Sequence, residues 1–303
     1  LNLSLMTGSL GCESAGLYVM TKENNQVGAW DMGTVPDSLP GRIPLEDSSG
    51  RKEWERVWNV KISPDQGLNM VRMLEEAENG NLKALYIMGE NPLRSLPQHE
   101  RVEAALKHLD LLVVQDILDT ETTRIADVVL PGAAFSEKGG SFTNMEGRIA
   151  SFKQVVPPPG DGKPDWEILD LLGFKMGYPK AYRSLDRIRA EMARLIPMYA
   201  SLKETPGDAW TWIRRTETGK TLRFSPLQTT EEGPMDDNYP LMAILGSQRF
   251  HLGGGTRTGS SKRIRDFGLK GEVSLSSNDG ARLQVKSGDT VHVQSREGAL
   301  IRE

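Results

Sequence analysis

The sequence is poor in three features that would each define a class of protein: it has one cysteine, no long apolar run and no excess of basic residues. Cys12 alone cannot form an internal disulfide, and one thiol cannot hold a zinc ion or an iron–sulfur cluster. No window approaches the roughly 18 uninterrupted apolar residues of a transmembrane helix. With 37 Lys and Arg against 41 Asp and Glu, the net charge of -4 gives no reason to expect nucleic acid as a partner.

The size and composition point to a globular chain with more than one packing unit. Its 303 residues exceed the usual size of one domain, and 38% hydrophobic with 26% charged residues is typical of globular proteins. The chain begins with Leu1, shows no signal-like leader, and stops within the expected second strand of a hairpin. We therefore expect the sequence to be an excerpt from a longer protein.

Short apolar runs alternate with segments of helical periodicity in the first half of the chain. The runs cover 84–88, 111–114 and 127–130, and the helical segments cover 68–79, 102–106 and 121–125. Continuous apolar strands connected through helices indicate a parallel sheet covered on both faces, so we expect an open α/β sheet. Ligands of such sheets bind beyond the carboxyl ends of the strands, which makes the loops 89–92 and 115–120 the geometric candidates for a site.

The remaining segments differ from this part in residue composition. Residues 1–50 are rich in glycine and polar residues and predict mostly ordered loop. Residues 155–164 are rich in proline and predict a semi-rigid connection. Beyond this connection the patterns predict helices and then part of a small β-barrel or sandwich, with helices at 166–176 and 186–195, strands at 241–245 and 273–276, and a hairpin over 287–298.

Polar residues follow two of the predicted strands. Asp116 could accept hydrogen bonds from a base or a ribose, whereas Asp119 or Thr120 is better explained as the cap of the next helix. The Gly-Glu-Asn-Pro sequence around Asn91 could place a backbone turn and an amide against a ligand, and an ordinary Asx-Pro turn explains it equally well. Residues 138–148 predict either a loop that approaches a ligand closely or a plain hairpin.

A glycine-rich stretch at 246–259 is the most informative part of the second half. Three consecutive glycines permit inward-facing backbone amides, which predicts phosphate binding, with a flexible basic surface loop as the alternative. Cations concentrate in and after the stretch although the chain is acidic overall, and they are Arg249, Arg257, Lys262, Arg263 and Arg265. Two serines follow Gly259 where a Walker loop requires lysine, and no strand–helix setting makes the stretch a dinucleotide fingerprint.

Two other chemistries find no support in the sequence. The four histidines lack the spacing of metal ligands, and no Gly-x-Ser-x-Gly turn is present. Cys12 has no evident histidine partner that would make it a nucleophile. The sequence therefore predicts neither metal ligation by histidine nor hydrolase chemistry.

A set of short strings follows one another in a specific order and spacing. They are Met6 to Gly11, Asn24 to Gly33, Met88 to Pro92, Val114 to Asp116, Ala126 to Pro131, Gly140 to Arg148, Asp165 to Leu169 and the glycine loop from Arg249. Together these strings resemble the large subunit of the dimethyl sulfoxide reductase family of molybdopterin oxidoreductases, nearest to formate dehydrogenase alpha subunits. The resemblance covers almost the whole chain and is carried by the order of the strings.

The resemblance implies three parts: a partial Rossmann-like parallel-sheet domain at 1–152, a proline-rich linker and helical connection at 153–225, and a truncated double-psi-like β-barrel domain at 226–303. It implies a bis(molybdopterin guanine dinucleotide) cofactor with molybdenum or tungsten. The residues that match the motifs contacting one guanine nucleotide are Asn91, Gln115, Asp116, Thr120 and Asp127. Those that match the barrel loop contacting pterin and phosphates are Arg249, His251, Gly255 and Thr256. The family's 4Fe-4S cysteines and metal ligand would lie before Leu1.

One pair of residues departs from the formate dehydrogenase pattern. Where those enzymes carry an arginine and a glutamine shortly before the Asn-Asn pair, this chain has Thr21 and Glu23. A hydroxyl and a carboxylate do not attract an anion, which disfavours formate as the substrate.

Two functions from different classes follow from the resemblance. The first is an oxidoreductase subunit that passes electrons between a small substrate and iron–sulfur centres, of which this fragment is not active alone. The second is a scaffold, an NADH–quinone-oxidoreductase-like large subunit with a vestigial pterin site, which Thr21 and Glu23 favour. Expected partners are the remainder of the chain and iron–sulfur electron-transfer subunits, with no nucleic acid and no direct membrane insertion. We expect a cytoplasmic location, and a periplasmic one stays open.

Overall fold

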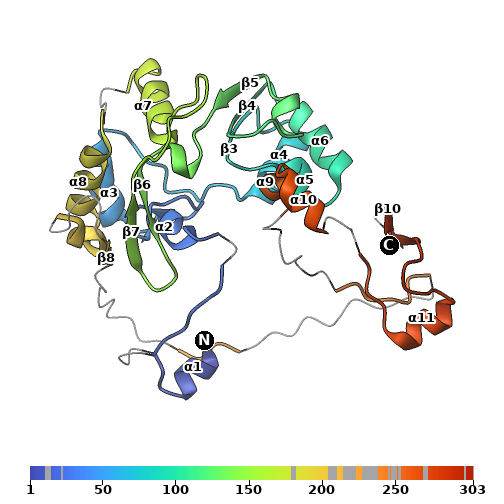
Figure 1. Cartoon of the computed structure of the whole chain (residues 1–303). Helices are drawn as coiled ribbons and strands as arrows, with labels where there is room; N and C mark the ends of the chain where they lie inside the picture. The colour runs from blue at the N-terminus through green and yellow to red at the C-terminus, as the bar shows by residue number, and fades with distance from the viewer. Residues whose placement is uncertain are drawn as a thin grey trace.

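A computed structural model describes most of the chain and shows a mixed α/β protein built around a parallel sheet (Figure 1). The described residues are 1–10, 15–21, 23–178, 182–203, 210–213, 223–226, 238–244, 246, 251, 254–268, 272–296 and 298–302. Among them, no helix is both long and apolar enough to cross a membrane.

The parallel sheet has the order β3-β4-β5, with strands Ala84–Met88, Leu111–Asp116 and Val128–Pro131. Both strand pairs are parallel, with Tyr86 opposite Val113 and Val113 opposite Val128. This confirms the parallel sheet that the apolar runs predicted. Because all three strands run the same way, their carboxyl ends meet at one edge of the sheet.

Two helices pack together beside this sheet and bury its first core. The helix α4 (Met70–Glu78) begins where the Asn69 side chain accepts a hydrogen bond from the Arg72 N–H, 3.0 Å away. The helix α6 (His99–Lys107) buries one face because its apolar residues recur at helical spacing. The first core consists of Ala77, Ile87, Leu93, Val102, Ala105, Leu106, Leu109, Leu112 and Val114.

The sheet is less covered than the sequence predicted. On the edge strand β5, Val128 is 42% exposed and Val129 is 48% exposed. Successive residues of a strand face opposite sides of the sheet, so neither face of β5 is fully covered by the described residues. Among the described residues, the expected cover on both faces is therefore incomplete at this edge.

A second unit joins the N-terminal segment to residues that follow the parallel sheet. Its core consists of Leu39, Trp54, Ile149, Ala193, Ile196, Tyr199 and Leu202. Its elements are α2 (Gln26–Asp31), β1 (Ser38–Leu39), β2 (Ile43–Pro44), α3 (Ser48–Trp58), β6 (Gly140–Thr143), β7 (Arg148–Phe152), α8 (Leu185–Leu195), η3 (Pro197–Lys203) and β8 (Trp210–Trp212). The helix α7 (Asp165–Lys175) contributes to neither core. The helix α1 (Asn2–Met6) precedes this second unit. Residues 1–50 thus contain helices as well as the loop expected there.

A series of buried polar contacts holds the elements of this second unit together. The Tyr199 hydroxyl donates to the Asp31 carboxylate across 2.9 Å, and the Thr143 and Tyr199 hydroxyl oxygens lie 2.7 Å apart. Arg42 donates from Nε to the other Asp31 oxygen across 2.5 Å. Asp31 is fully buried, so this ion pair and hydrogen bond satisfy a charge that water does not reach.

The segment around Gly147 is a hairpin. Strands β6 and β7 pair antiparallel, and Thr143 lies opposite Ile149. Residues 140–143 and 148–152 thus form the hairpin that was one of the two interpretations of residues 138–148. The prolines 157–159 follow this hairpin and precede α7, as the predicted connection requires.

The C-terminal part differs most from expectation. Residues 241–244 and 272–276 have no regular secondary structure, although strands were predicted there. From residue 254 onward the described elements are α9 (Thr256–Gly259), α10 (Lys262–Gly268), α11 (Ser277–Leu283) and the antiparallel hairpin β9 (Val291–Ser295) with β10 (Gly298–Arg302). The predicted double-psi-like barrel is therefore not present in the described residues, and only the hairpin of that prediction is confirmed.

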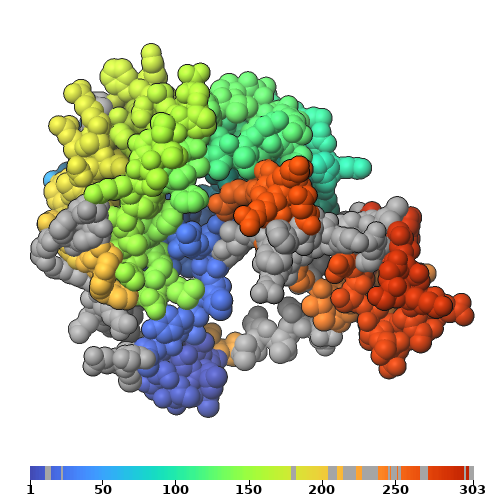
Figure 2. All heavy atoms as spheres, in the orientation of Figure 1, coloured from blue at the N-terminus to red at the C-terminus, as the bar shows by residue number. Residues whose placement is uncertain are grey.

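Figure 1 shows where these C-terminal elements lie. The helices α9 and α10 sit against the region of β3, α4 and α5, whereas α11 and the β9–β10 hairpin lie apart from the parallel sheet. Figure 2 shows the same division, with the atoms of α9 and α10 seated on those of the sheet unit. Residues about 150 positions apart in the sequence therefore meet at the strand ends.

Candidate cofactor site

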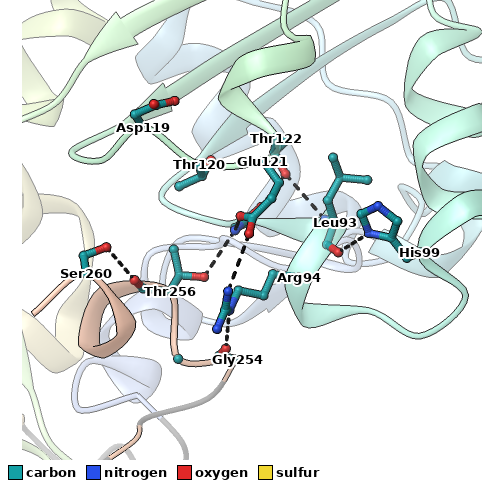
Figure 3. A network of polar contacts seen from close by, with 12 residues as sticks. Leu93, Arg94, His99, Asp119, Thr120, Glu121, Thr122, Gly254, Thr256 and Ser260 are labelled. Atoms are coloured by element: carbon teal, nitrogen blue, oxygen red, sulfur yellow. Dashed lines mark hydrogen bonds and ion pairs between the residues drawn. The ribbon is translucent and has the colours of Figure 1, made fainter. Parts of the chain in front are cut away.

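The candidate site is formed where the loops after two neighbouring strands meet a remote loop (Figure 3). The chain leaves β3 at Met88 and enters the short helix α5 (Pro92–Ser95) through Asn91. It leaves β4 at Asp116 and passes through residues 117–122 to the 3₁₀ turn η1 (Thr123–Ile125). Both loops lie at the carboxyl edge of the sheet, where α/β proteins bind their ligands.

Asn91 joins the two strand-end loops. Its Oδ1 accepts from the Thr122 hydroxyl at 2.6 Å, and its Nδ2 donates to the Glu121 carboxylate at 2.8 Å. Asn91 is only 3% exposed and Thr122 is fully buried, so these bonds satisfy groups that water does not reach. The amide therefore fixes the position of one loop relative to the other.

The remote loop, residues 254–260, lies against this junction. The Asn91 Nδ2 lies 3.3 Å from the Thr256 hydroxyl, and Arg94 donates from Nε to the Gly254 carbonyl at 2.7 Å. Gly255 has φ +76°, a left-handed conformation that favours glycine and turns the chain into α9. The pair of contacts brings residues 254–260 to the strand ends.

His251 precedes the remote loop in the sequence and contacts it. Its Nδ1 lies 2.6 Å from the Thr258 hydroxyl. Its Nε2 is buried and has no hydrogen-bond partner among the residues that the structure describes. A buried imidazole nitrogen without a partner costs free energy, so this atom is a natural contact point for a polar ligand.

A fourth segment reaches the site from the N-terminal part. Arg257, in α9, forms an ion pair with Glu23 across 3.3 Å. Burial raises the pKa of Asp116, and the positive charge of Arg257 offsets part of that rise. The Glu23 carboxylate is thus balanced by an arginine from the remote loop.

Two carboxyl groups of the site have opposite pKa shifts. Burial raises the pKa of Asp116 above its usual value, although its carboxylate accepts N–H bonds from Leu118 at 3.1 Å and Ile117 at 2.7 Å. The hydrogen bond from Asn91 lowers the pKa of Glu121, and the charge of Arg94 adds to that effect. Glu121 is therefore held ionised, whereas Asp116 lies in surroundings that penalise its charge.

The structure brings together most of the predicted site residues that it describes. Asn91, Thr256 and His251 belong to the contacts above, and the Asp116 carboxyl group lies within the influence of Arg257. Thr120 is buried, and its hydroxyl accepts from the Thr123 N–H at 3.2 Å. The N-cap of η1 is Thr122, so the cap expected at Asp119 or Thr120 is wrong. Arg249 and Cys12 lie outside the described residues.

Two predicted residues serve other contacts. The Gln115 amide accepts from the Tyr86 hydroxyl and donates to Asp165 at 2.6 Å, which ties β4 to the start of α7. Asp127 is exposed and accepts from the Leu112 N–H at 2.6 Å. Because Leu112 lies at the start of β4 and Asp127 precedes β5, Asp127 lies at the amino-terminal edge of the sheet, opposite to the site.

Three residues of the site, Arg94, Glu121 and Thr122, were not predicted from the sequence. The Pro at the first position of α5 is a helix-start signal, and it would have placed Arg94 on a helical turn beside the strand end. Nothing local to Glu121 or Thr122 indicates that they meet Asn91, which is about 30 positions away. Among the described residues, no three His, Cys, Asp or Glu side chains gather as ligands for a metal ion.

The fold and the site together define a class: an α/β protein with a polar site at the carboxyl edge of a parallel sheet, closed by a remote glycine-rich loop. Comparison with known protein families specifies that class further. The family model described as "Molybdopterin oxidoreductase" matches residues 1–173, which is more than half of the chain. The chain belongs to the molybdopterin oxidoreductase family.

Two curated relatives match nearly the whole chain. It is 35% identical over 319 residues to the F420-dependent formate dehydrogenase subunit alpha of Methanocaldococcus jannaschii, covering 99% of the chain and 47% of that subunit. It is 33% identical over 304 residues to an NADH-quinone oxidoreductase subunit of Rhizobium meliloti, covering 99% of the chain and 34% of that protein. The chain therefore spans half the length of these relatives or less.

One solved structure is also similar. The acetylene hydratase from Pelobacter acetylenicus aligns with 55% of this chain and 24% of its own, with 22% sequence identity and a TM-score of 0.39. Membership of the family implies a molybdopterin cofactor with molybdenum or tungsten.

Proposed function

We propose that the strand-end loops and the loop at 254–260 together hold the guanine dinucleotide form of the molybdopterin cofactor, as part of an oxidoreductase subunit. The observation that carries this proposal is the convergence of Asn91, Arg94 and Thr256 at the carboxyl edge of the sheet. A nucleotide at such an edge uses loop amides and side chains of successive strands. A remote loop with a left-handed glycine adds a second wall that phosphate oxygens can approach closely.

The residues present fit such a group. His251 offers a buried Nε2 that no described residue satisfies, and a pterin or phosphate oxygen would accept a hydrogen bond from it. Asp116 has a carboxyl group whose charge is penalised by burial, and the N–H groups of a guanine edge would relieve that penalty. Arg257 would bring positive charge to the phosphates and stays partly balanced by Glu23.

Each of these residues then has a distinct task. Asp116 accepts from the base, His251 donates to the pterin or a phosphate, and Gly255 lets the backbone approach. Arg249 is expected to contribute a second cation from the same loop. When bound, the cofactor supplies the exchange of electrons at its molybdenum or tungsten, and this chain supplies position and charge.

For the whole protein, we propose electron transfer between a small substrate and iron–sulfur centres. Neither Thr21 nor Glu23 supplies the positive charge that would hold formate, so we propose a substrate other than formate. The remainder of the same polypeptide supplies the metal ligand and the 4Fe-4S cluster, and this fragment alone is inactive. Both relatives are named as subunits, which supports other subunits as partners. We propose that these are iron–sulfur electron-transfer subunits and that the assembly is cytoplasmic.

A scaffold without a cofactor is the second candidate, and one observation favours it. The Asn91 side chain bonds to Thr122, Glu121 and Thr256, so its amide is already satisfied by protein. A vestigial site would close on itself in this way. The similarity to a protein named as part of NADH-quinone oxidoreductase agrees with this alternative.

Metal and pterin analysis of the purified full-length protein separates the two candidates. The proposed function predicts molybdenum or tungsten together with pterin, whereas the scaffold predicts iron with neither. An Arg249→Ala variant of the full-length protein tests the remote loop, and we expect it to retain less cofactor. Molybdenum and tungsten contents equal to those of the unaltered protein would contradict the role given to Arg249.

A further inference from the structure

A hollow between α8 and η3 has charged walls that nothing described above uses. Its volume is about 490 Å³, within the range of pockets that bind small molecules. Seven described residues line it, and they are Asp186, Arg189, Ala190, Ala193, Arg194, Leu202 and Lys203. Figure 1 shows α8 on the other side of the molecule from α9, so the hollow is separate from the candidate cofactor site.

The floor of the hollow is apolar. Ala193 is 2% exposed and Leu202 is 6% exposed, and both belong to the second core. Ala190 extends this surface along α8. A short hydrocarbon group placed here would gain the free energy of leaving water, about 25 cal/mol for each Å² that it buries.

The walls carry an excess of positive charge. Three cations face one carboxylate, Asp186, which stands eight residues before Arg194 on α8, or about 12 Å along the helix axis. Within the described part of the chain, Arg194 pairs only with Glu191, at 3.8 Å, and Glu191 does not line the hollow. Among the described residues, no carboxylate lies within ion-pair distance of Arg189 or Lys203.

Arg189 is held in place without its charge being balanced by a described residue. Its Nη1 donates to the Ser151 hydroxyl at 2.6 Å, which anchors the guanidinium against β7. Its Nη2 is buried and has no hydrogen-bond partner within the described ranges. Binding of an anion to the exposed side of this half-buried guanidinium is favourable, because no described carboxylate balances its charge.

We propose that this hollow binds a small organic oxyanion, a carboxylate or phosphate on a short apolar body. The anionic group lies between Arg189, Arg194 and Lys203, and the apolar body lies on Ala193 and Leu202. Guanidinium groups match the geometry of carboxylate and phosphate oxygens, and the ammonium of Lys203 adds a point charge. The site takes its ligand independently of the cofactor, because the two sites share no residue.

Isothermal titration of the full-length protein with phenyl phosphate, benzoate, benzyl alcohol and inorganic phosphate tests the proposal. We expect saturable binding of phenyl phosphate or benzoate and no measurable binding of benzyl alcohol. The tighter of the two anions identifies the group that the site prefers. Inorganic phosphate should bind more weakly than phenyl phosphate, because it leaves the apolar floor uncovered.

Variants assign the binding to the hollow. Arg189→Gln and Lys203→Gln, on different walls, should each weaken binding about ten-fold or more, because each removes a charge-assisted contact. Arg187→Gln is the matched control, since Arg187 lies on the same helix outside the hollow. Lys203→Gln remains informative if Arg189→Gln fails to fold. Equal affinity in Arg189→Gln and Lys203→Gln, equal binding of benzyl alcohol, or no binding of either anion would overturn the proposal.

Discussion

The Asn91 amide nitrogen lies 3.3 Å from the Thr256 hydroxyl, although the two residues are 165 positions apart in the sequence. Asn91 follows the first strand of the parallel sheet, and Thr256 begins the helix of the remote glycine loop. The contact places a basic, glycine-rich loop directly over the carboxyl edge of the sheet. The proposed cofactor site depends on this relationship.

Removing the Asn91 side chain should destabilise the site. Asn91→Ala leaves the buried Thr122 hydroxyl without its acceptor and removes one hydrogen bond from the Glu121 carboxylate, which keeps its ion pair with Arg94 at 3.5 Å. An unsatisfied buried group costs about 1–3 kcal/mol, and we expect a loss of unfolding free energy in that range. Chemical denaturation of the full-length protein measures it. Asn81→Ala, at an exposed asparagine bonded to Glu76, is the control and should cost less. Equal losses in the two variants would contradict the role of Asn91.

The buried hydrogen bonds among Asp31, Tyr199 and Thr143 lead to a separate prediction. Tyr199→Phe keeps the packed ring and removes the hydroxyl that donates to Asp31. Within the described ranges, the fully buried carboxylate then keeps only Arg42 as a partner, and we expect a loss of about 1–3 kcal/mol. Thermal and denaturant unfolding check this. Tyr182→Phe is the control, because its hydroxyl bonds to the only partly buried Glu191. A Tyr199→Phe variant as stable as the unaltered protein would show that this bond contributes nothing.

The pKa shift of Asp116 predicts a pH dependence. Burial raises the pKa of Asp116 in the folded state, so the folded state binds more protons than the unfolded state between the two values. The contribution of this group to stability therefore falls as pH rises from its unfolded pKa through its raised folded pKa. Asp116→Asn removes this cost and still offers an oxygen to the N–H groups of Ile117 and Leu118.

We therefore expect Asp116→Asn to melt a few degrees higher at neutral pH in the absence of cofactor, with a smaller difference in acid. Melting temperatures measured from about pH 4 to about pH 8 test this effect. Asp119→Asn is the control of opposite sign, because the hydrogen bond from Arg124 lowers the pKa of Asp119. A lower melting temperature of Asp116→Asn at neutral pH would mean that the charge is stabilised rather than penalised.

The ion pair between Glu23 and Arg257 should contribute little to the free energy of unfolding. The side chains are 41% and 61% exposed, so solvent screens the 3.3 Å contact. Exposed pairs contribute about 0.2–1 kcal/mol, and a double-mutant cycle with Glu23→Gln and Arg257→Gln should give a coupling in that range that disappears at high salt. A coupling well above it, or one insensitive to salt, would show that the pair is shielded from solvent.

The sequence predicted the sheet because its information is local. The runs at 84–88 and 111–114 are apolar along their whole length, and the buried residues of α6 recur at helical spacing. The structure extends β4 to Asp116 and shifts β5 by one residue, which periodicity alone does not resolve. The position of the edge at which ligands bind then followed from the rules of parallel sheets.

The failures concern residues whose structure depends on distant partners. Residues 241–244 and 273–276 carry β-branched and apolar residues, but in the described chain no neighbouring strand pairs with them. The N-terminal helix α2 has Asp31 fixed by Tyr199 from 168 positions away, which no local pattern reveals. The family resemblance assigned both Asn91 and Thr256 to cofactor binding, but their contact with each other, and the parts played by Glu121 and Arg94, became visible only in the structure.

The most direct test of the shared site is amide hydrogen exchange of the full-length protein with its cofactor bound and after the cofactor has been removed. The account predicts that binding slows exchange in residues 89–94, 116–122 and 254–260 together, because all three segments contact one ligand. Slowing in the strand-end loops without slowing in 254–260, or no slowing in any of them, would contradict it.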